Sequence, residues 1–128
     1  MTSQYAGATN DPTGYSTSVY GITMSSGTNA IPALNSPAVS IPGVSQFGMN
    51  LRTNSAPNIG RDPAGAGTSV ALADYNQPNM FTFKNQTISK STTSTDFNVF
   101  TVSYLVNVSS SQPAGIYNTT LTYIATAS

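Results

Sequence analysis

The chain has 128 residues, of which four are Lys or Arg and four are Asp, and it contains no Glu, His or Cys. Four scattered cations are too few to displace the counterions of a nucleic acid, which excludes nucleic-acid binding. The lack of Cys excludes a disulfide framework and thiolate metal sites. The sequence contains no run of about 18 apolar residues, so no segment of it is expected to span a membrane. The length predicts a single domain over residues 1–128.

Hydroxyl and amide side chains take the place of charged ones. The sequence holds 18 Ser, 18 Thr and 12 Asn, and Ser and Asn disfavour helices because they compete for backbone hydrogen bonds. Thr suits the pleated surface of a strand, as do Val, Ile and Tyr. Ten Gly and eight Pro separate short alternating runs, which is typical of sandwiches and barrels. The composition therefore predicts an all-β, antiparallel β-sandwich.

The first part of the chain predicts weak strands and one long loop. Residues 1–13 are loop-like, whereas residues 15–24 and 46–52 alternate in hydrophobicity as strands do. Residues 39–41 predict a short edge strand. Residues 54–79 are rich in Gly, Pro, Ala and Asn and predict a long loop, and loops of this length are usually functional or mobile.

The second part holds the strongest strand signals. Residues 98–108 alternate over eleven positions, and Val99 and Leu105 on the second face indicate either that this strand is central or that its second face is also partly covered. Residues 116–126 alternate as well, while residues 80–84 and Thr87-Ile88 predict shorter strands. The two long runs predict an antiparallel pair, either adjacent in one sheet or bridging two.

Three tyrosines belong to these long runs. Tyr104, Tyr117 and Tyr123 alternate with apolar residues, so we expect them in or near the core. Tyr117 follows the turn predicted by Pro113 and Gly115, and its hydroxyl is expected to tie that corner down.

The predicted long loop carries the candidate ligand-binding residues Tyr75, Asn76, Asp74 and Asn58. Tyr75 is expected to be exposed there, and its ring and hydroxyl suit a carbohydrate ligand. Calcium needs only oxygen ligands, which Asp62, Asp74, Asn58 and Asn76 could supply, but no Asp-x-Asp-x-Asp spacing is present. Loop Asp and Asn more often cap turns, and no other metal or cofactor is predicted.

Catalytic residues are scarce. General acid–base chemistry would depend on four Asp that are well separated in the sequence, with a Ser–Lys pair as the formal alternative. The chain is therefore predicted not to be an enzyme. Lys84 could form an intramolecular isopeptide bond with Asp96 or an Asn, but the Glu that usually catalyses this bond is absent. An ordinary surface lysine is the default interpretation.

Two segments carry a family resemblance. Residues 100–104 and the segment 112–123, which contains a Pro-Ala-Gly-x-Tyr pattern, resemble the C-terminal half of secreted β-sandwich proteins from ultrasmall candidate-phylum bacteria. Residues 13–19 resemble their early Thr-Gly-Tyr strand, and the Pro-Ala-Gly-x-Tyr ending is similar to pilin-like and spore-coat-like surface domains. The resemblance implies an immunoglobulin-like or pilin-like sandwich at the cell surface. It also implies a further strand before residue 13, so it leaves open whether this chain lacks an N-terminal strand.

Together these observations predict a non-enzymatic extracellular or cell-surface structural or adhesion domain. Its expected partners are other copies of itself or another surface protein, bound through strand edges in the manner of a fibre subunit. The alternative is a carbohydrate- or surface-binding module that binds glycans through residues 54–79. No signal peptide follows Met1, so a secreted precursor is expected to have lost it from this fragment.

Overall fold

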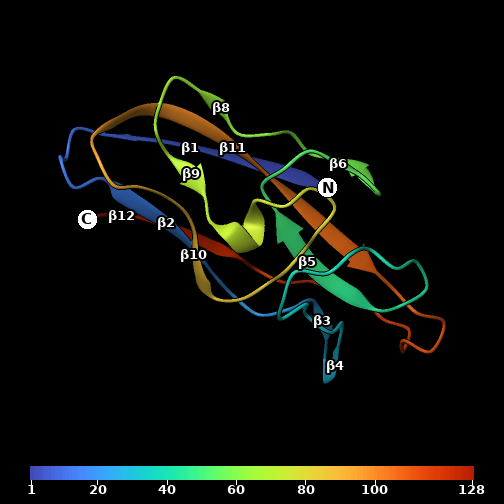
Figure 1. Cartoon of the computed structure of the whole chain (residues 1–128). Helices are drawn as coiled ribbons and strands as arrows, with labels where there is room; N and C mark the ends of the chain where they lie inside the picture. Colours follow the sequence, from blue (N-terminus) through green and yellow to red (C-terminus); the bar gives the residue numbers. More distant parts are fainter.

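The strongest hydrophobic alternation coincides with the longest strand of the molecule. The computed structural model describes residues 1–128, and its strand β11 (Thr95–Asn107) crosses the whole first sheet (Figure 1). On one side β11 pairs with β1 (Thr2–Thr9), and on the other with β5 (Gln46–Asn50) and the short β8 (Ala64–Gly65). All these pairings are antiparallel.

A second antiparallel sheet lies against the first. Its strand order is β12-β2-β10-β9, so β12 forms one edge and β9 the other. The bounds are β2 (Tyr15–Tyr20), β9 (Val70–Ala71), β10 (Gln86–Ser91) and β12 (Thr122–Ala127). The antiparallel all-β sandwich predicted from the sequence is confirmed.

Short elements complete the chain. Two small hairpins and one 3-10 turn lie outside the two main sheets, and no α-helix is present. They are β3 (Ser25–Ser26) with β4 (Asn29–Ala30), β6 (Asn54–Ser55) with β7 (Asn58–Ile59), and η1 (Ala73–Tyr75). The structure contains no helix whose length and hydropathy would let it cross a membrane.

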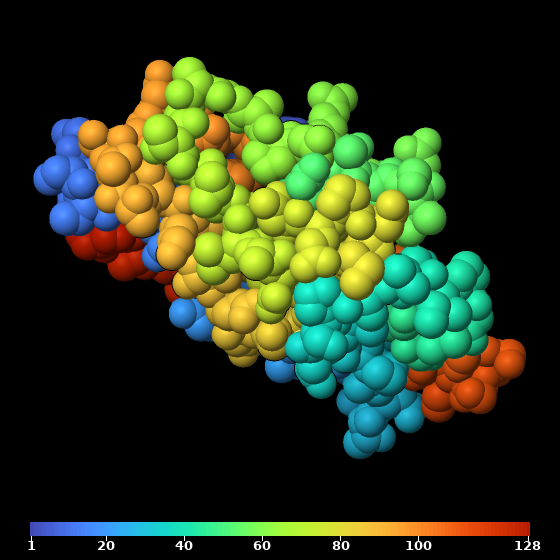
Figure 2. Space-filling model, in the orientation of Figure 1, coloured from blue at the N-terminus to red at the C-terminus, as the bar shows by residue number.

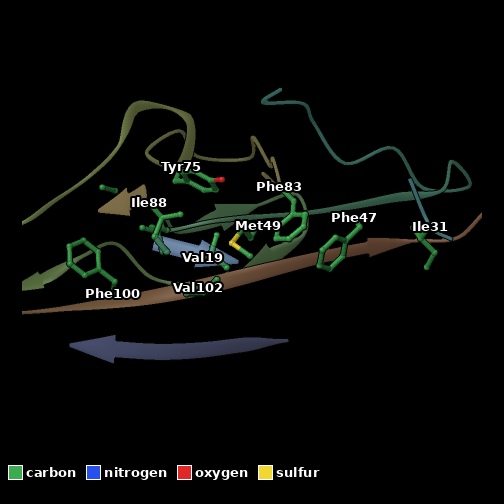
Figure 3. Close-up of a cluster of buried hydrophobic side chains, with 11 residues drawn as sticks. Val19, Ile31, Phe47, Met49, Tyr75, Phe83, Ile88, Phe100 and Val102 are labelled. Atoms are coloured by element: carbon green, nitrogen blue, oxygen red, sulfur yellow. The ribbon is translucent and has the colours of Figure 1, made fainter. Parts of the chain in front are cut away.

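The core lies between the sheets and is mostly aliphatic and aromatic. Each fully buried side chain of this kind contributes about 1.5–3 kcal/mol by leaving water. Phe100 and Val102 reach the core from β11, and Val19 reaches it from the opposite sheet (Figure 3). The rest of the cluster is Ile31, Phe47, Met49, Leu51, Ala71, Tyr75, Phe83 and Ile88.

The second face of β11 is also covered, as its apolar residues predicted. Leu105 is only 3 % exposed and Ser103 is fully buried. The segment after β7 crosses over this face, and Gly60 packs so closely against Ser103 that a side chain there would collide with its hydroxyl. The prediction is confirmed for Leu105, whereas Val99 is exposed.

The prediction that residues 1–13 are loop-like is wrong. Residues Thr2–Thr9 form β1, paired with β11 from Thr2↔Ser103 to Thr9↔Thr95. Little hydrophobic alternation marks this segment, and its strand forms because β11 offers a long edge and because Tyr5 stacks on Phe100 with ring centroids 5.2 Å apart. A strand therefore does precede the Thr-Gly-Tyr segment.

The prediction of one long loop over residues 54–79 is also wrong. The segment contains β6 to β9 and η1, and buried amides hold it in place. Residues 39–41 form no strand, and residues 80–84 make only isolated bridges, although Phe81 and Phe83 are buried as expected. Of residues 116–126, only the part from Thr122 onward is a strand, and the two long runs lie in different sheets.

Candidate functional site: the open seam

The sandwich has two seams, where an edge of one sheet faces an edge of the other. We define the closed seam as the side of β5 and β9. Here the β5 edge is bonded to other chain segments: the Phe47 N–H donates to the Pro32 carbonyl at 2.9 Å, and Met49 exchanges two backbone hydrogen bonds with Thr82. Figure 2 shows segments 30–45 and 55–85, coloured teal to yellow, forming a continuous surface.

Buried asparagines hold these covering segments together. Asn50 and Asn54 exchange side-chain amide hydrogen bonds of 2.6 and 3.0 Å. Asn50 also donates to the carbonyls of Gln77 and Met80, and the Asn79 N–H donates to the Asn54 side chain at 2.7 Å. Because nearly every amide atom has a partner, the network is rigid and fixes one arrangement of the segment.

We define the open seam as the opposite side, where β1 and β12 are the sheet edges. No backbone ladder joins these two strands, and only side chains meet across them. Tyr123 of β12 hydrogen-bonds the hydroxyl of Tyr104 and lies against Tyr5, with ring centroids 6.0 Å apart. The Tyr104 hydroxyl also pairs with Ser3 at 2.8 Å.

An apolar groove of about 590 Å³ opens at one end of this seam. It lies between the first residues of β1 and the segment that leads into β12, and Phe47 lies among its lining residues. The other apolar and aromatic lining residues are Met1, Met24, Tyr104, Val106, Tyr117, Leu121 and Tyr123. All the side chains that line it are uncharged.

One peptide unit of β11 faces this groove without a strand partner. The β1 ladder ends where the Tyr104 N–H donates to the Met1 carbonyl at 3.1 Å. Two residues on, Val106 lies opposite Phe47 of β5, but Phe47 uses its own N–H and C=O with Pro32 and Leu34. The Val106 N–H and C=O therefore point away from β5, toward the groove, in the pattern of an antiparallel ladder.

Charge and ionisation keep the open seam neutral. None of the eight charged side chains lies in β1 or β12 or lines the groove. Burial raises the pKa of the Tyr5 hydroxyl and of the Tyr123 hydroxyl, and Tyr104 raises that of Tyr123 further. Both groups thus stay protonated near neutral pH and serve as hydrogen-bond partners.

The sequence-predicted ligand residues do not form a site. Tyr75 is fully buried among Ile88, Met49 and Phe83 (Figure 3), so its prediction as an exposed binding residue is wrong. Burial raises the pKa of its hydroxyl, which accepts a 2.9 Å hydrogen bond from Gln86.

The remaining predicted residues have separate partners. Asp74 pairs with Lys84 at 3.2 Å, and Asn76 accepts from the Arg52 guanidinium. Asp62 also binds Arg52, at 2.7 Å, which lowers its pKa. Asn58 is exposed in β7 and lines a different hollow. The acidic groups are thus taken up by cations, and no group of three or more metal-binding side chains exists.

Lys84 faces Asp74 rather than Asp96, so the geometry expected for an isopeptide bond to Asp96 is absent. Tyr117 behaves as predicted, because its hydroxyl donates to the Pro113 carbonyl at 2.7 Å and ties down that corner. Tyr104, Tyr117 and Tyr123 pack at the rim of the core. Their place along a groove could not be predicted from the sequence, since it depends on the two long runs lying in different sheets.

Comparison with models of known protein families, with curated protein sequences and with solved structures found no match to this chain.

Proposed function

We propose that this protein is a non-enzymatic structural or adhesion domain of the cell exterior, whose copies assemble by pairing strands at the open seam. The proposal keeps the extracellular location and the immunoglobulin-like or pilin-like type implied by the resemblance of residues 13–19, 100–104 and 112–123. The single observation that carries it is the state of the two edge strands. Neither β1 nor β12 contains a charged side chain or a proline.

Exposed strand edges are normally protected, because an unpaired row of N–H and C=O groups recruits another chain. Natural proteins block such edges with Lys, Pro or a covering loop. Here the covering segments are all on the closed seam, and Lys84 and Lys90 lie outside both open-seam strands. The open seam thus offers backbone partners, a neutral groove and no electrostatic repulsion between copies.

Strand addition would use these features together. Main-chain hydrogen bonds supply affinity, and pockets for alternate side chains supply specificity. The outer edges of β1 and β12 provide the hydrogen bonds, and the groove lined by Met24, Phe47 and Leu121 provides the side-chain pocket. The rate of association is expected to depend little on salt, since no charges steer the encounter.

Intermolecular paramagnetic relaxation tests this proposal. A nitroxide attached at Ala6→Cys on β1 is mixed with unlabelled, ¹⁵N-enriched wild-type chain, in parallel with light scattering against concentration. We expect mass to rise with concentration, and amide signals of β1, β12 and the end of β11 to broaden in the unlabelled copies.

The matched control carries the nitroxide at Ala66→Cys, another exposed alanine, between β8 and β9 on the side of β11 opposite to β1. Its label should leave the open-seam signals unbroadened. A chain that stays monomeric at every concentration, or equal broadening from the two labels, would refute assembly through the open seam.

A further inference from the structure

β1 is attached to the sandwich differently from the other long strands. Most of its residues are exposed, and Tyr5 is its one large core-facing side chain. Tyr5 stacks on Phe100 and pairs with the Ser89 hydroxyl at 2.7 Å, and Gln4 donates to Thr101 at 3.0 Å. We call this set of partners, together with the β11 edge, the β1 slot.

A short hinge joins β1 to the rest of the chain. Residues 10–14 carry the chain from one sheet to the other, and Asp11 holds them closed. Its carboxylate accepts from the Thr13 N–H at 2.8 Å and from the Thr13 hydroxyl at 2.6 Å, and its carbonyl accepts from the Gly14 N–H. The Asp11 bonds are local, whereas the Thr13 hydroxyl and the Gly14 carbonyl also bond Ser128, which follows β12, at 2.6 and 3.0 Å.

We infer that copies of this chain exchange β1, so that β1 of one molecule occupies the β1 slot of a second. The inference rests on the proposed function and names its partner, a second copy, and its donated strand. The occupant's fit is established by the structure itself, because an exchanged β1 recovers the whole register from Thr2↔Ser103 to Thr9↔Thr95. Only the hinge changes conformation, which makes such exchange a low-cost route to assembly.

The composition of β1 favours exchange over a permanently closed strand. Short polar strands that contain Gly specify their pairing weakly and are prone to swapping, and β1 reads Thr-Ser-Gln-Tyr-Ala-Gly-Ala-Thr. The hinge that would have to open is short, since it spans only residues 10–14. Gly14 has a φ of +86°, and a side chain there would collide with the Ser91 carbonyl, so the closed hinge depends on a left-handed glycine.

Cysteine pairs across the slot report exchange directly, because the chain has no cysteine of its own. Gln4 and Thr101 are opposite each other in a non-hydrogen-bonded pair, since the even-numbered residues of β11 face β1 through their peptide groups. Such pairs bring the two Cα atoms to about 4.5 Å, within the range of a disulfide. Full-length Gln4→Cys and Thr101→Cys chains are mixed, concentrated and mildly oxidised, and the disulfide-linked heterodimer is quantified.

The control mixture is Ser18→Cys with Thr87→Cys. Their native side-chain oxygens are 3.0 Å apart on β2 and β10, which stay within one chain when only β1 exchanges. We expect about tenfold more heterodimer from the slot pair than from the control pair, since only β1 then meets its partner strand in another copy. Asp11→Ala, which opens the hinge, should speed the cross-linking several-fold.

A third sample separates this inference from the proposed function. The double variant Gln4→Cys/Thr101→Cys, oxidised while dilute, locks β1 into its own slot. Exchange predicts that this locked monomer no longer assembles although the wild type does. If the locked monomer assembles like the wild type and the slot pair gives no excess heterodimer, strand exchange is refuted while edge pairing stands. A wild type that never assembles refutes both.

Discussion

The two seams of the sandwich differ in how the edge strands of the sheets are covered. At the closed seam, the outward-facing peptide groups of β5 form hydrogen bonds with residues 32–34 and 82, and asparagine amides hold the covering segments in place. At the open seam, β1 and β12 end their sheets with no cover, and three tyrosine rings connect them. The edge strand of the closed seam thus has its backbone hydrogen bonds satisfied within the chain, whereas the edge strands of the open seam keep backbone N–H and C=O groups that can pair with another strand.

The difference is sharpest at one pair of residues, and hydrogen exchange should show it as the largest effect. Phe47 and Val106 are register partners, but the Phe47 N–H is bonded to Pro32 and the Val106 N–H faces the groove. In dilute, monomeric protein we expect Phe47 to exchange at least about a thousandfold more slowly, because its release needs cooperative opening. Similar protection of the two amides would remove the distinction between the seams.

Truncation of one aromatic side chain at each seam gives the next largest effect. Phe81 is fully buried at the closed seam and exchanges two backbone hydrogen bonds with Ala38. Phe81→Ala should lower the free energy of unfolding by about 3–5 kcal/mol, since it leaves a cavity. Tyr117→Ala at the open seam should lower it by about 1 kcal/mol. Denaturant unfolding measures both, and equal losses would contradict the comparison.

The asparagine network of the closed seam gives an intermediate effect. Asn50→Ala removes the amide hydrogen bonds that Asn50 makes with Asn54 and with the Gln77 carbonyl, and it leaves the Met80 carbonyl without a partner. We expect the free energy of unfolding to fall by about 2–3 kcal/mol, because several hydrogen bonds of a buried side chain are lost together. Asn107→Ala, a half-buried amide outside this network, is the control. A cost for Asn50→Ala no greater than that of the control would show that the network is dispensable.

Acid should give the smallest effect. Arg52 lowers the pKa of Asp62 below its ordinary value of 3.8 in the folded state. A depressed pKa means that the pair stabilises the fold above the unfolded-state pKa, and that this stabilisation is lost as pH falls below it.

The expected loss between pH 5 and strongly acid conditions is about 0.5 kcal/mol, because solvent screens an exposed pair. Asp62→Asn should lack this part of the pH dependence when unfolding is measured at each pH. Assembly through the open seam should not show this pH dependence, because β1 and β12 contain no carboxylate side chain.

Local patterns predicted the strands that carry the core. Residues 98–108 alternate strongly enough to identify β11, and the scarcity of charge indicated surfaces for pairing. β1 was missed because its strand character comes from the edge of β11, which is distant in sequence. Tyr75 was misplaced because Gly- and Pro-rich neighbours indicate a loop, whereas η1 turns its ring into the core.

The groove lay beyond sequence reasoning for a related reason. Its lining combines residues near position 1, near 104 and near 120, which meet only because β11 and β12 lie in opposite sheets. The sequence left that arrangement open. Alternation identifies which side chains face inward along one strand, but it does not say which strand lies across from it.

The directions of the terminal strands have a mechanical consequence. The two chain ends lie at opposite ends of the sandwich (Figure 1), and β1 and β12 both run from the N-terminal end toward the C-terminal end. Tension between the ends therefore slides each strand along its neighbour and loads the hydrogen bonds of that pair together, instead of peeling them off one by one. A domain that is stretched between its two ends in this geometry would resist mechanical unfolding.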